Sequence, residues 1–189
     1  MDQLDLGPGL EDYALCGGAS FSPDAPILAV DGLIWAPDGL CKPYAEGANG
    51  TTNADGGGLV LLRRGGAAEG CLGWLLGSGT NNDGQRKTTF SAPSYEGQVE
   101  VLRQAQQDAQ VSAVDYVEGH GTGTRLGDPL EVSALTAVLP KEKVTLLGSV
   151  KGNVGHLNTA AGAWIRVGVS PSSPHLCGNM HMYACFKMF

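Results

Sequence analysis

Short apolar runs alternate with glycine-rich stretches along the first half of the chain. Apolar residues cluster at positions 14–16, 59–62 and 74–76, and each cluster ends in glycines or arginines. Runs of this length that end in turn residues are typical of buried strands. Residues 36–58 combine a Pro-Asp-Gly turn signal with further glycines and predict a loop-rich segment.

Helical spacing appears in the middle of the chain. The apolar residues of positions 93–110 recur at helical spacing with polar residues between them, which predicts an amphipathic helix. Residues 114–117 then predict a strand. Asp128 followed by a proline predicts the start of a second helix with Asp128 as its N-cap, and Pro140 predicts its end.

The last part of the chain continues this alternation and then loses it. Residues 144–150 predict a strand, residues 151–156 a loop, and a helix is expected from about Asn158. Strands that alternate with helices predict an α/β fold. Residues 164–189 contain no Asp or Glu and sustain no period, so we expect a poorly specified tail.

Composition and charge exclude several classes of protein. The 189 residues are 42% hydrophobic and 16% charged with a formal net charge of -7, and no basic stripe exists to neutralise phosphates. No apolar run approaches the ~20 residues that span a bilayer, and the N-terminus lacks the features of a signal peptide. The five cysteines are irregularly spaced, which favours a reducing compartment. We therefore expect a cytoplasmic globular protein with neither nucleic acid nor membrane as a partner.

Two histidines occupy equivalent positions in the predicted fold. His120 and His156 each lie in a glycine-bearing loop after a predicted strand. In an open α/β sheet, such loops lie at the carboxyl ends of the strands, where ligands bind. An imidazole can exchange a proton or hydrogen-bond a developing oxyanion. Spacing alone leaves two interpretations open: a shared site, or two turn histidines far apart.

Three further side chains near these histidines could serve the same site. Lys151 stands at the end of a predicted strand, where its charge could act on a neighbouring carboxylate or imidazole. The hydroxyls of Thr122 and Thr124 can bond amides or phosphates of a ligand tail. The alternatives are a solvated lysine and ordinary turn threonines. The loop itself does not predict nucleotide binding, because Leu126 stands where a dinucleotide fingerprint has its third glycine.

The tail carries four side chains of the types that bind zinc, within eleven residues. They are His175, Cys177, His181 and Cys185. Zinc accepts such a set in tetrahedral geometry. The spacing matches no standard zinc pattern, so we expect no metal site. A metal-stabilised binding protein built on this cluster remains an alternative.

Three motifs resemble the signatures of β-ketoacyl synthases, with the ketosynthase domains of polyketide synthases as the nearest type. They are Val117-Glu118-Gly119-His120-Gly121-Thr122-Gly123-Thr124, Leu126-Gly127-Asp128-Pro129-Leu130-Glu131 and Gly148-Ser149-Val150-Lys151-Gly152-Asn153-Val154-Gly155-His156. Weaker matches precede them in the same order, among them the stretch from Pro37 to Tyr44. The resemblance covers about residues 11–163.

The resemblance implies an α/β, thiolase-like fold in incomplete form. Such a chain comprises the central part and C-terminal half of a condensing-enzyme domain. The organisation that follows is a partial ketosynthase domain at residues 1–163 and a divergent tail at residues 164–189.

The resemblance also implies a decarboxylative Claisen condensation between an acyl thioester and a malonyl-type extender, in polyketide or fatty acid biosynthesis. His120 and His156 match the family histidines that assist loss of CO2 and stabilise enolate and thioester oxyanions. Lys151 matches a lysine with an electrostatic and structural role. Thr122 and Thr124 match residues that contact the phosphopantetheine arm. The implied partners are acyl carrier protein and, in the full-length domain, a second copy of the chain. The substrates are carried on phosphopantetheine, and the chain itself is expected to bind no cofactor.

Two departures from the family pattern bear on activity. The family's nucleophilic Cys lies in a Thr-Ala-Cys-Ser-Ser-Ser turn, and none of Cys16, Cys41 and Cys71 stands in that context. We therefore expect this chain alone to be inactive. Gly119 also replaces the usual alanine before His120. The alternative from another class is a non-catalytic interaction module that keeps carrier-protein or dimer surfaces.

Overall fold

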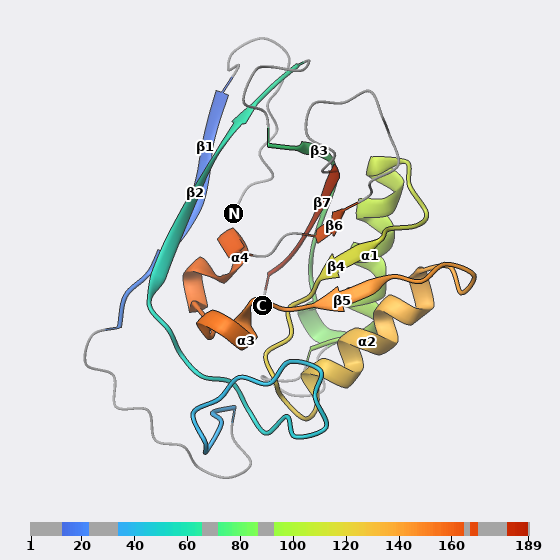
Figure 1. The fold of residues 1–189 in the computed structure, drawn as a ribbon. Coiled ribbons are helices and arrows are strands. Elements are labelled where there is room, and N and C mark those ends of the chain that lie inside the picture. The colour runs from blue at the N-terminus through green and yellow to red at the C-terminus, as the bar shows by residue number, and fades with distance from the viewer. Residues whose placement is uncertain are drawn as a thin grey trace.

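Strands and short helices alternate along the chain, as the sequence predicts for an α/β protein (Figure 1). The computed structural model describes residues 13–22, 34–65, 72–86, 93–164, 167–169 and 181–188. The strands are β1 (Tyr13–Ser20), β2 (Gly56–Arg63), β3 (Trp74–Asn82), β4 (Tyr116–Glu118), β5 (Leu146–Gly148), β6 (Val167–Val169) and β7 (His181–Met188). The helices are α1 (Tyr95–Ala109), α2 (Gly127–Val138), α3 (Lys151–Val154) and α4 (Ala161–Trp164), with 3-10 turns η1 (Gly84–Arg86) and η2 (Asn158–Ala160).

The strands of the described residues form three small sheets. β1 and β2 pair antiparallel, and β3 pairs in parallel with β7. In the third sheet β4 is the central strand, parallel to β5 and antiparallel to β6. Because β4 and β5 run in parallel, the loops that follow them leave the sheet at the same edge.

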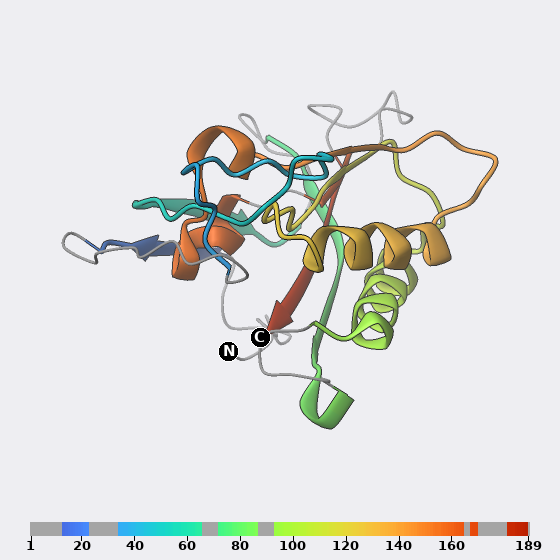
Figure 2. The same cartoon turned by 90° about the horizontal axis from the view of Figure 1, so that it is seen from below.

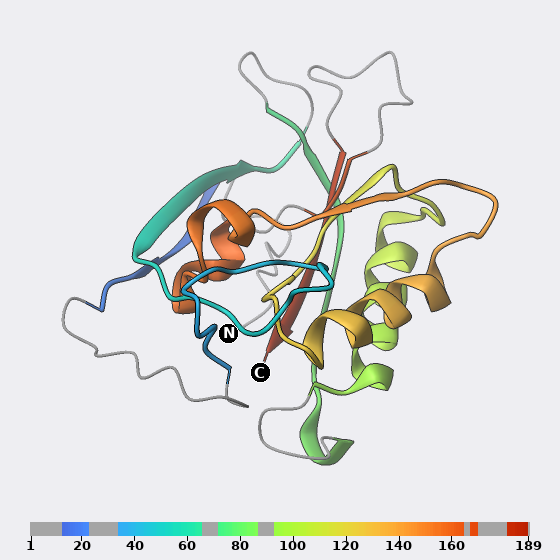
Figure 3. The same ribbon diagram turned by 60° about the horizontal axis from the view of Figure 1, so that its bottom comes forward.

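The helices lie on two sides of the strands. On one side α1 packs against β3, β7 and α2. On the other side α4 and η2 pack against the β1–β2 ribbon (Figure 1). Figure 3 shows the same order, with α3 and α4 between the β1–β2 ribbon and the remaining strands, and in Figure 2, seen from below, α1 and α2 lie on the side of β3 and β7 that faces away from the ribbon.

A small hydrophobic core anchors β4, the strand that leads into the first histidine loop. Val114, Val117 and Leu135 are its buried members, and the partly buried Leu102 and Leu147 pack against them. Burial of one such side chain stabilises a fold by roughly 1.5–3 kcal/mol. Since Val117 lies in β4 and Leu135 in α2, their contact fixes α2 relative to the strand.

β3 extends further than the sequence predicts. The glycines after residue 76 suggested a strand end, whereas β3 continues to Asn82. A Cβ atom at Gly77 would lie 2.3 Å from the backbone nitrogen of Ala109, and one at Gly79 would lie 2.5 Å from the carbonyl oxygen of Val101. Helix α1 therefore lies directly on the backbone of β3, and these glycines serve close packing and not a turn.

The predicted N-cap of α2 is wrong. The helix begins at Gly127, and the carboxylate of Asp128 accepts hydrogen bonds from the backbone N–H groups of Tyr44 (2.8 Å) and Gly123 (3.1 Å). The hydroxyl of Thr124 accepts a bond from the N–H of Gly127 instead (3.2 Å). Asp128 thus connects the loop of Tyr44 with the loop of Gly123, which are distant in sequence. A local helix pattern cannot predict such a contact.

The region after residue 144 also differs in detail. β5 is shorter than the predicted strand over 144–150, and Lys151–Val154 form a helical turn where a loop was predicted. Within the region 164–189, β6 pairs with β4 and β7 with β3. The division into a domain and a tail at residue 163 stays a prediction.

Candidate functional site

The two histidine loops meet at one edge of the three-stranded sheet of β4, β5 and β6. His120 follows β4 and His156 follows β5 through the short helix α3. Their ring centroids are 5.5 Å apart, and the ring planes are perpendicular. This proximity confirms the prediction of a shared location and excludes two distant turn histidines.

Backbone amides of the His120 loop are held by a carboxylate from α2. Glu131 accepts hydrogen bonds from the N–H groups of His120 (2.6 Å) and Gly121 (3.0 Å). Gly121 and Gly123 adopt left-handed conformations, with φ of +41° and +72°. Residues with a Cβ atom disfavour that conformation, so the glycines allow the sharp path of the loop.

His156 is held from its backbone and from one ring nitrogen. Its N–H donates to the carbonyl oxygen of Thr52 (2.7 Å), and its Nδ1 accepts a bond from the N–H of Asn158 (2.9 Å). Burial, and then the positive charge of Lys151, lower the pKa of His156 to about 4. Near neutral pH the imidazole is therefore uncharged, and because Nδ1 is an acceptor, its proton is on Nε2.

Lys151 is a buried lysine whose charge acts on the pKa of His156. Its exposed fraction is 3%. Burial lowers the pKa of Lys151, whereas the negative charges of Glu131 and Glu118 oppose that shift. Glu118, exposed by only 7%, accepts a hydrogen bond from the N–H of Val150 (2.5 Å). The carboxylates near Lys151 come from earlier in the chain.

The two threonines of the His120 loop bond each other. Thr122 and Thr124 bring their hydroxyl oxygens within 3.2 Å, and Thr122 is buried. Thr124 also bonds the first residue of α2, as described above. Both hydroxyls therefore have a structural role in the loop, beside the ligand contact that the resemblance implies.

The comparisons with known proteins agree with this geometry. Residues 72–169 match the family described as Beta-ketoacyl synthase, C-terminal domain, and residues 5–68 match Beta-ketoacyl synthase, N-terminal domain. The chain belongs to the β-ketoacyl synthase family. The resemblance found in the sequence motifs is thereby confirmed.

The relatives are polyketide synthases. Polyketide synthase PksN of Bacillus subtilis (strain 168) is 39% identical in an alignment of 169 residues that covers 83% of this chain and 3% of PksN. Erythronolide synthase EryA3 of Saccharopolyspora erythraea is 47% identical in an alignment of 163 residues that covers 79% of this chain and 5% of EryA3. The chain thus spans a small part of the curated relatives it matches.

Solved ketosynthase structures share the fold. The ketosynthase from module 1 of the bacillaene synthase of Bacillus amyloliquefaciens FZB42 matches with a TM-score of 0.72 and 40% identity, over 80% of this chain and 30% of that chain. A ketosynthase from module 6 of the bacillaene synthase of Bacillus subtilis 168 matches with a TM-score of 0.70 and 30% identity, over 94% of this chain and 36% of that chain. The α/β, thiolase-like fold expected of this ketosynthase chain is confirmed.

Several residues that shape the ketosynthase site were not assigned a role from the sequence. Glu118 and Glu131 stood within the quoted motifs, and Tyr44 stood at the end of a weaker match. The structure connects them: Tyr44 donates a hydrogen bond to Glu131 (2.9 Å), and Glu118 lies near Lys151. The available signal was the position of acidic residues inside glycine-rich motifs, where a solvated face is not expected.

The structure describes the cysteines and the tail cluster only in part. Cys41 is buried, and burial raises the pKa of its thiol. His175 and Cys177 lie outside the described residues, and of His181 and Cys185 the structure describes the backbone of β7. The described ranges contain no group of three or more His, Cys, Asp or Glu that could hold a metal ion.

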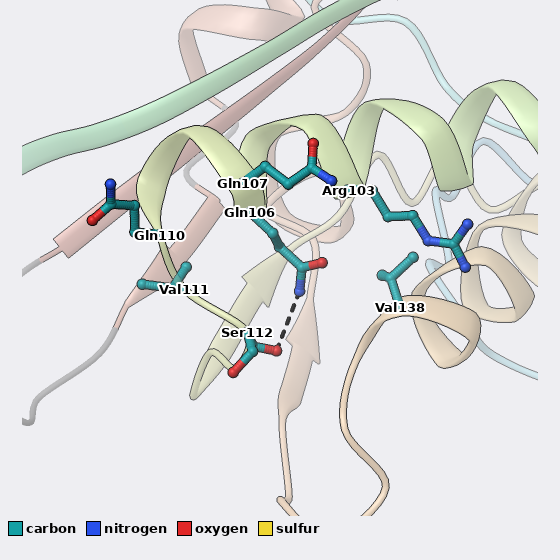
Figure 4. A pocket seen from close by; sticks show the side chains of 7 residues that line it. All are labelled: Arg103, Gln106, Gln107, Gln110, Val111, Ser112 and Val138. Carbon is teal, nitrogen blue, oxygen red and sulfur yellow. Dashed lines mark hydrogen bonds between the residues drawn. The ribbon is translucent and has the colours of Figure 1, made fainter.

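An open groove of about 390 Å³ lies away from the histidines, at the C-terminal ends of α1 and α2 (Figure 4). Glutamines of α1 dominate its wall, and Gln106 donates a hydrogen bond to the carbonyl oxygen of Ser112 (3.3 Å). None of the five predicted site residues lines it. Among the described residues, no helix has the length and apolar character needed to cross a membrane.

Proposed function

We propose that His120, His156 and Lys151 form the oxyanion-stabilising part of a condensing site of the 3-oxoacyl-[acyl-carrier-protein] synthase type. The observation that carries this proposal is the pair of imidazoles 5.5 Å apart at the ends of parallel strands. One of them, His156, is neutral near pH 7 and presents an Nε2–H donor. Donors fixed in advance, where negative charge develops, stabilise a transition state.

The reaction proposed for the site begins with a malonyl-type thioester. Its carbon–carboxylate bond breaks, CO2 leaves, and the electron pair of that bond forms an enolate with charge on the thioester oxygen. The α-carbon of the enolate then attacks the carbonyl of an acyl thioester on a cysteine. The bond between the acyl carbon and the cysteine sulfur then breaks, and the cysteine leaves as thiolate. Negative charge therefore develops on the enolate oxygen and then on the carbonyl oxygen of the attacked thioester. Both oxygens need hydrogen-bond donors, which His120 and His156 supply.

Lys151 acts through its charge and not through proton transfer in this proposal. Its buried ammonium group favours the uncharged form of His156, because two like charges so close together are unfavourable. A neutral imidazole retains a single Nε2 proton to donate. Burial lowers the pKa of Lys151, and the negative charges of Glu131 and Glu118 act in the opposite direction and favour its charged form.

The substrates are proposed to arrive on acyl carrier protein. Thr122 and Thr124 would contact the phosphopantetheine arm that carries them, and the full-length domain would act as a homodimer. We place this chemistry in the cytoplasm, in line with the irregular cysteine spacing. None of the five cysteines stands in the family's nucleophile motif, so we expect the isolated 189-residue chain to show no condensation.

The test is single-turnover malonyl decarboxylation in a reconstructed domain that adds the nucleophile-bearing part of a bacterial relative. Changing His120 or His156 to alanine should each reduce the rate by about 10²–10³-fold, the usual effect of removing one oxyanion donor. The double variant should lose much less than the product of the two effects, because donors that act as a unit are not additive.

A variant of the distant groove, Gln107→Ala, is the matched control and should keep the wild-type rate. Thr122→Ala and Thr124→Ala should raise KM for the carrier-bound substrate more than they lower kcat. A near wild-type rate in either histidine variant would remove that histidine from the proposed site.

A further inference from the structure

Tyr44 is bound at both of its ends to α2, the helix whose Glu131 holds the His120 loop. Its backbone is left-handed, with φ of +58°, and its N–H donates to Asp128 (2.8 Å). Its hydroxyl donates to Glu131 (2.9 Å), the same carboxylate that accepts the N–H groups of His120 and Gly121. The Tyr44 hydroxyl is thus a third donor to the group that holds the histidine loop.

Gly119, the residue before His120, leaves the space that this hydroxyl occupies. A Cβ atom at Gly119 would lie 1.9 Å from the hydroxyl oxygen of Tyr44 and 3.0 Å from its Cζ. Real Cβ atoms do not approach other atoms to within 3.0 Å, so alanine at position 119 and a hydroxyl at position 44 cannot coexist without a shift. The backbone of Gly119 is outside the left-handed region, so the requirement for glycine here is one of space.

We propose that Tyr44 and Gly119 form a matched pair that positions His120 through Glu131. Tyr44 is a positioning residue in this proposal: its hydroxyl orients the carboxylate, and the carboxylate orients the two loop amides. The meaning for catalysis rests on the proposed function, whereas the pair itself rests on contacts within the chain.

The Tyr44 hydroxyl is a permanent donor. Burial, and then the charge of Glu131, raise the pKa of Tyr44 far above its usual value. The phenol therefore keeps its proton and cannot exchange roles with the carboxylate. A carboxylate with three hydrogen bonds has little freedom to rotate, because bonds to a charged group are stronger than those between neutral groups.

The test compares four forms of the full 189-residue chain: wild type, Tyr44→Phe, Gly119→Ala and the double variant. The readout is hydrogen exchange at the His120 and Gly121 amides, together with the global free energy of unfolding. Tyr44→Phe should speed exchange at these two amides by about tenfold, in excess of any global change, since the carboxylate that protects them loses one anchor.

Gly119→Ala should disturb the same amides more strongly, because it forces the Tyr44 ring away. The double variant should return them close to the level of Tyr44→Phe alone, since the atom at 1.9 Å is gone and the remaining contacts, to Cζ of the ring at 3.0 Å and to Oε1 of Glu131 at 3.1 Å, need only small movements. If Gly119→Ala alone fails to fold, recovery of folding in the double variant supports the matched pair in the same way.

Tyr116→Phe is the matched control. Tyr116 also donates its hydroxyl to a carboxylate, that of Glu118. This carboxylate accepts the backbone N–H of Val150, whereas Glu131 accepts those of His120 and Gly121. Replacement of Tyr116 should leave exchange at His120 and Gly121 unchanged. In the reconstructed domain, Tyr44→Phe should lower kcat for malonyl decarboxylation while KM stays constant.

Unchanged exchange in Tyr44→Phe, or a double variant as disturbed as Gly119→Ala, would overturn the proposal. The exchange measurement needs no substrate. A reconstructed domain without decarboxylase activity would therefore count against the proposed function and leave the pair standing.

Discussion

Acidification should lower the free energy of unfolding through the lowered pKa of His156. Its pKa in the folded protein is about 4, because burial and the charge of Lys151 disfavour the imidazolium. An unfolded chain binds the same proton near pH 6.5. Between these two values the unfolded state holds more protons than the folded state, so the free energy of unfolding falls as the pH falls. Above pH 6.5 both states are neutral and this contribution is constant.

The size of the effect follows from the same two values. A difference of one unit in pKa corresponds to about 1.4 kcal/mol, so the fall from 6.5 to about 4 sets an upper bound of roughly 3.5 kcal/mol. The ring of His156 is only half-buried and water screens part of the interaction. We therefore expect a loss of about 1–2 kcal/mol between pH 6.5 and pH 4.

The assay combines an NMR titration of the His156 ring with urea unfolding at a series of pH values. Lys151→Met should raise the pKa of His156 towards 6.5, because it removes the nearby positive charge but leaves the burial. Lys143→Met is the control, since Lys143 forms a salt bridge with Asp115 at the surface. His156→Gln should remove the corresponding part of the pH dependence. A His156 ring that titrates at pH 6.5 or above would refute the reasoning, and so would an unchanged pKa in Lys151→Met.

Three further outcomes are expected. Gly123→Ala should destabilise the fold by more than the ~1–2 kcal/mol of left-handed strain, because its Cβ would lie 2.8 Å from a carbonyl oxygen. In the control, Gly39→Ala, the Cβ meets nothing within 4 Å, so chemical denaturation should show the cost of the strain alone. Asp128→Asn should lower the free energy of unfolding by about 1–3 kcal/mol, since a weaker acceptor faces two buried loop amides, and a loss well under 1 kcal/mol would contradict the bonds described. Iodoacetamide should modify Cys16 before the buried Cys41 in the native protein, as peptide mass spectrometry would show; equal rates would mean that Cys41 is accessible.

Patterns among near neighbours predicted much of this fold. The helix over 93–110 appears as α1, and the two histidines lie where parallel strand ends bring them. Both predictions use periodicity and strand direction, which are properties of a local segment. The same reasoning failed for Asp128, because its carboxylate bonds a loop 84 positions earlier in the chain.

The site itself was only half predictable for the same physical reason. His120, His156 and Lys151 stand in motifs that can be read in one segment, but the role of Glu131 depends on Tyr44, which is 87 positions away. Gly119 could be noted as a departure from the family pattern. Its reason becomes visible only when the Tyr44 hydroxyl is seen in the space that a Cβ would fill.

The loop that carries His120 owes its shape to Glu131, to Asp128 and to left-handed glycines. All of these act on the backbone of the loop, whatever side chain stands at position 120. In evolution, the imidazole could be exchanged in one step while these backbone contacts stay in place. Descendants without activity would then remain recognisable by their acidic residues and glycines, long after the histidine had gone.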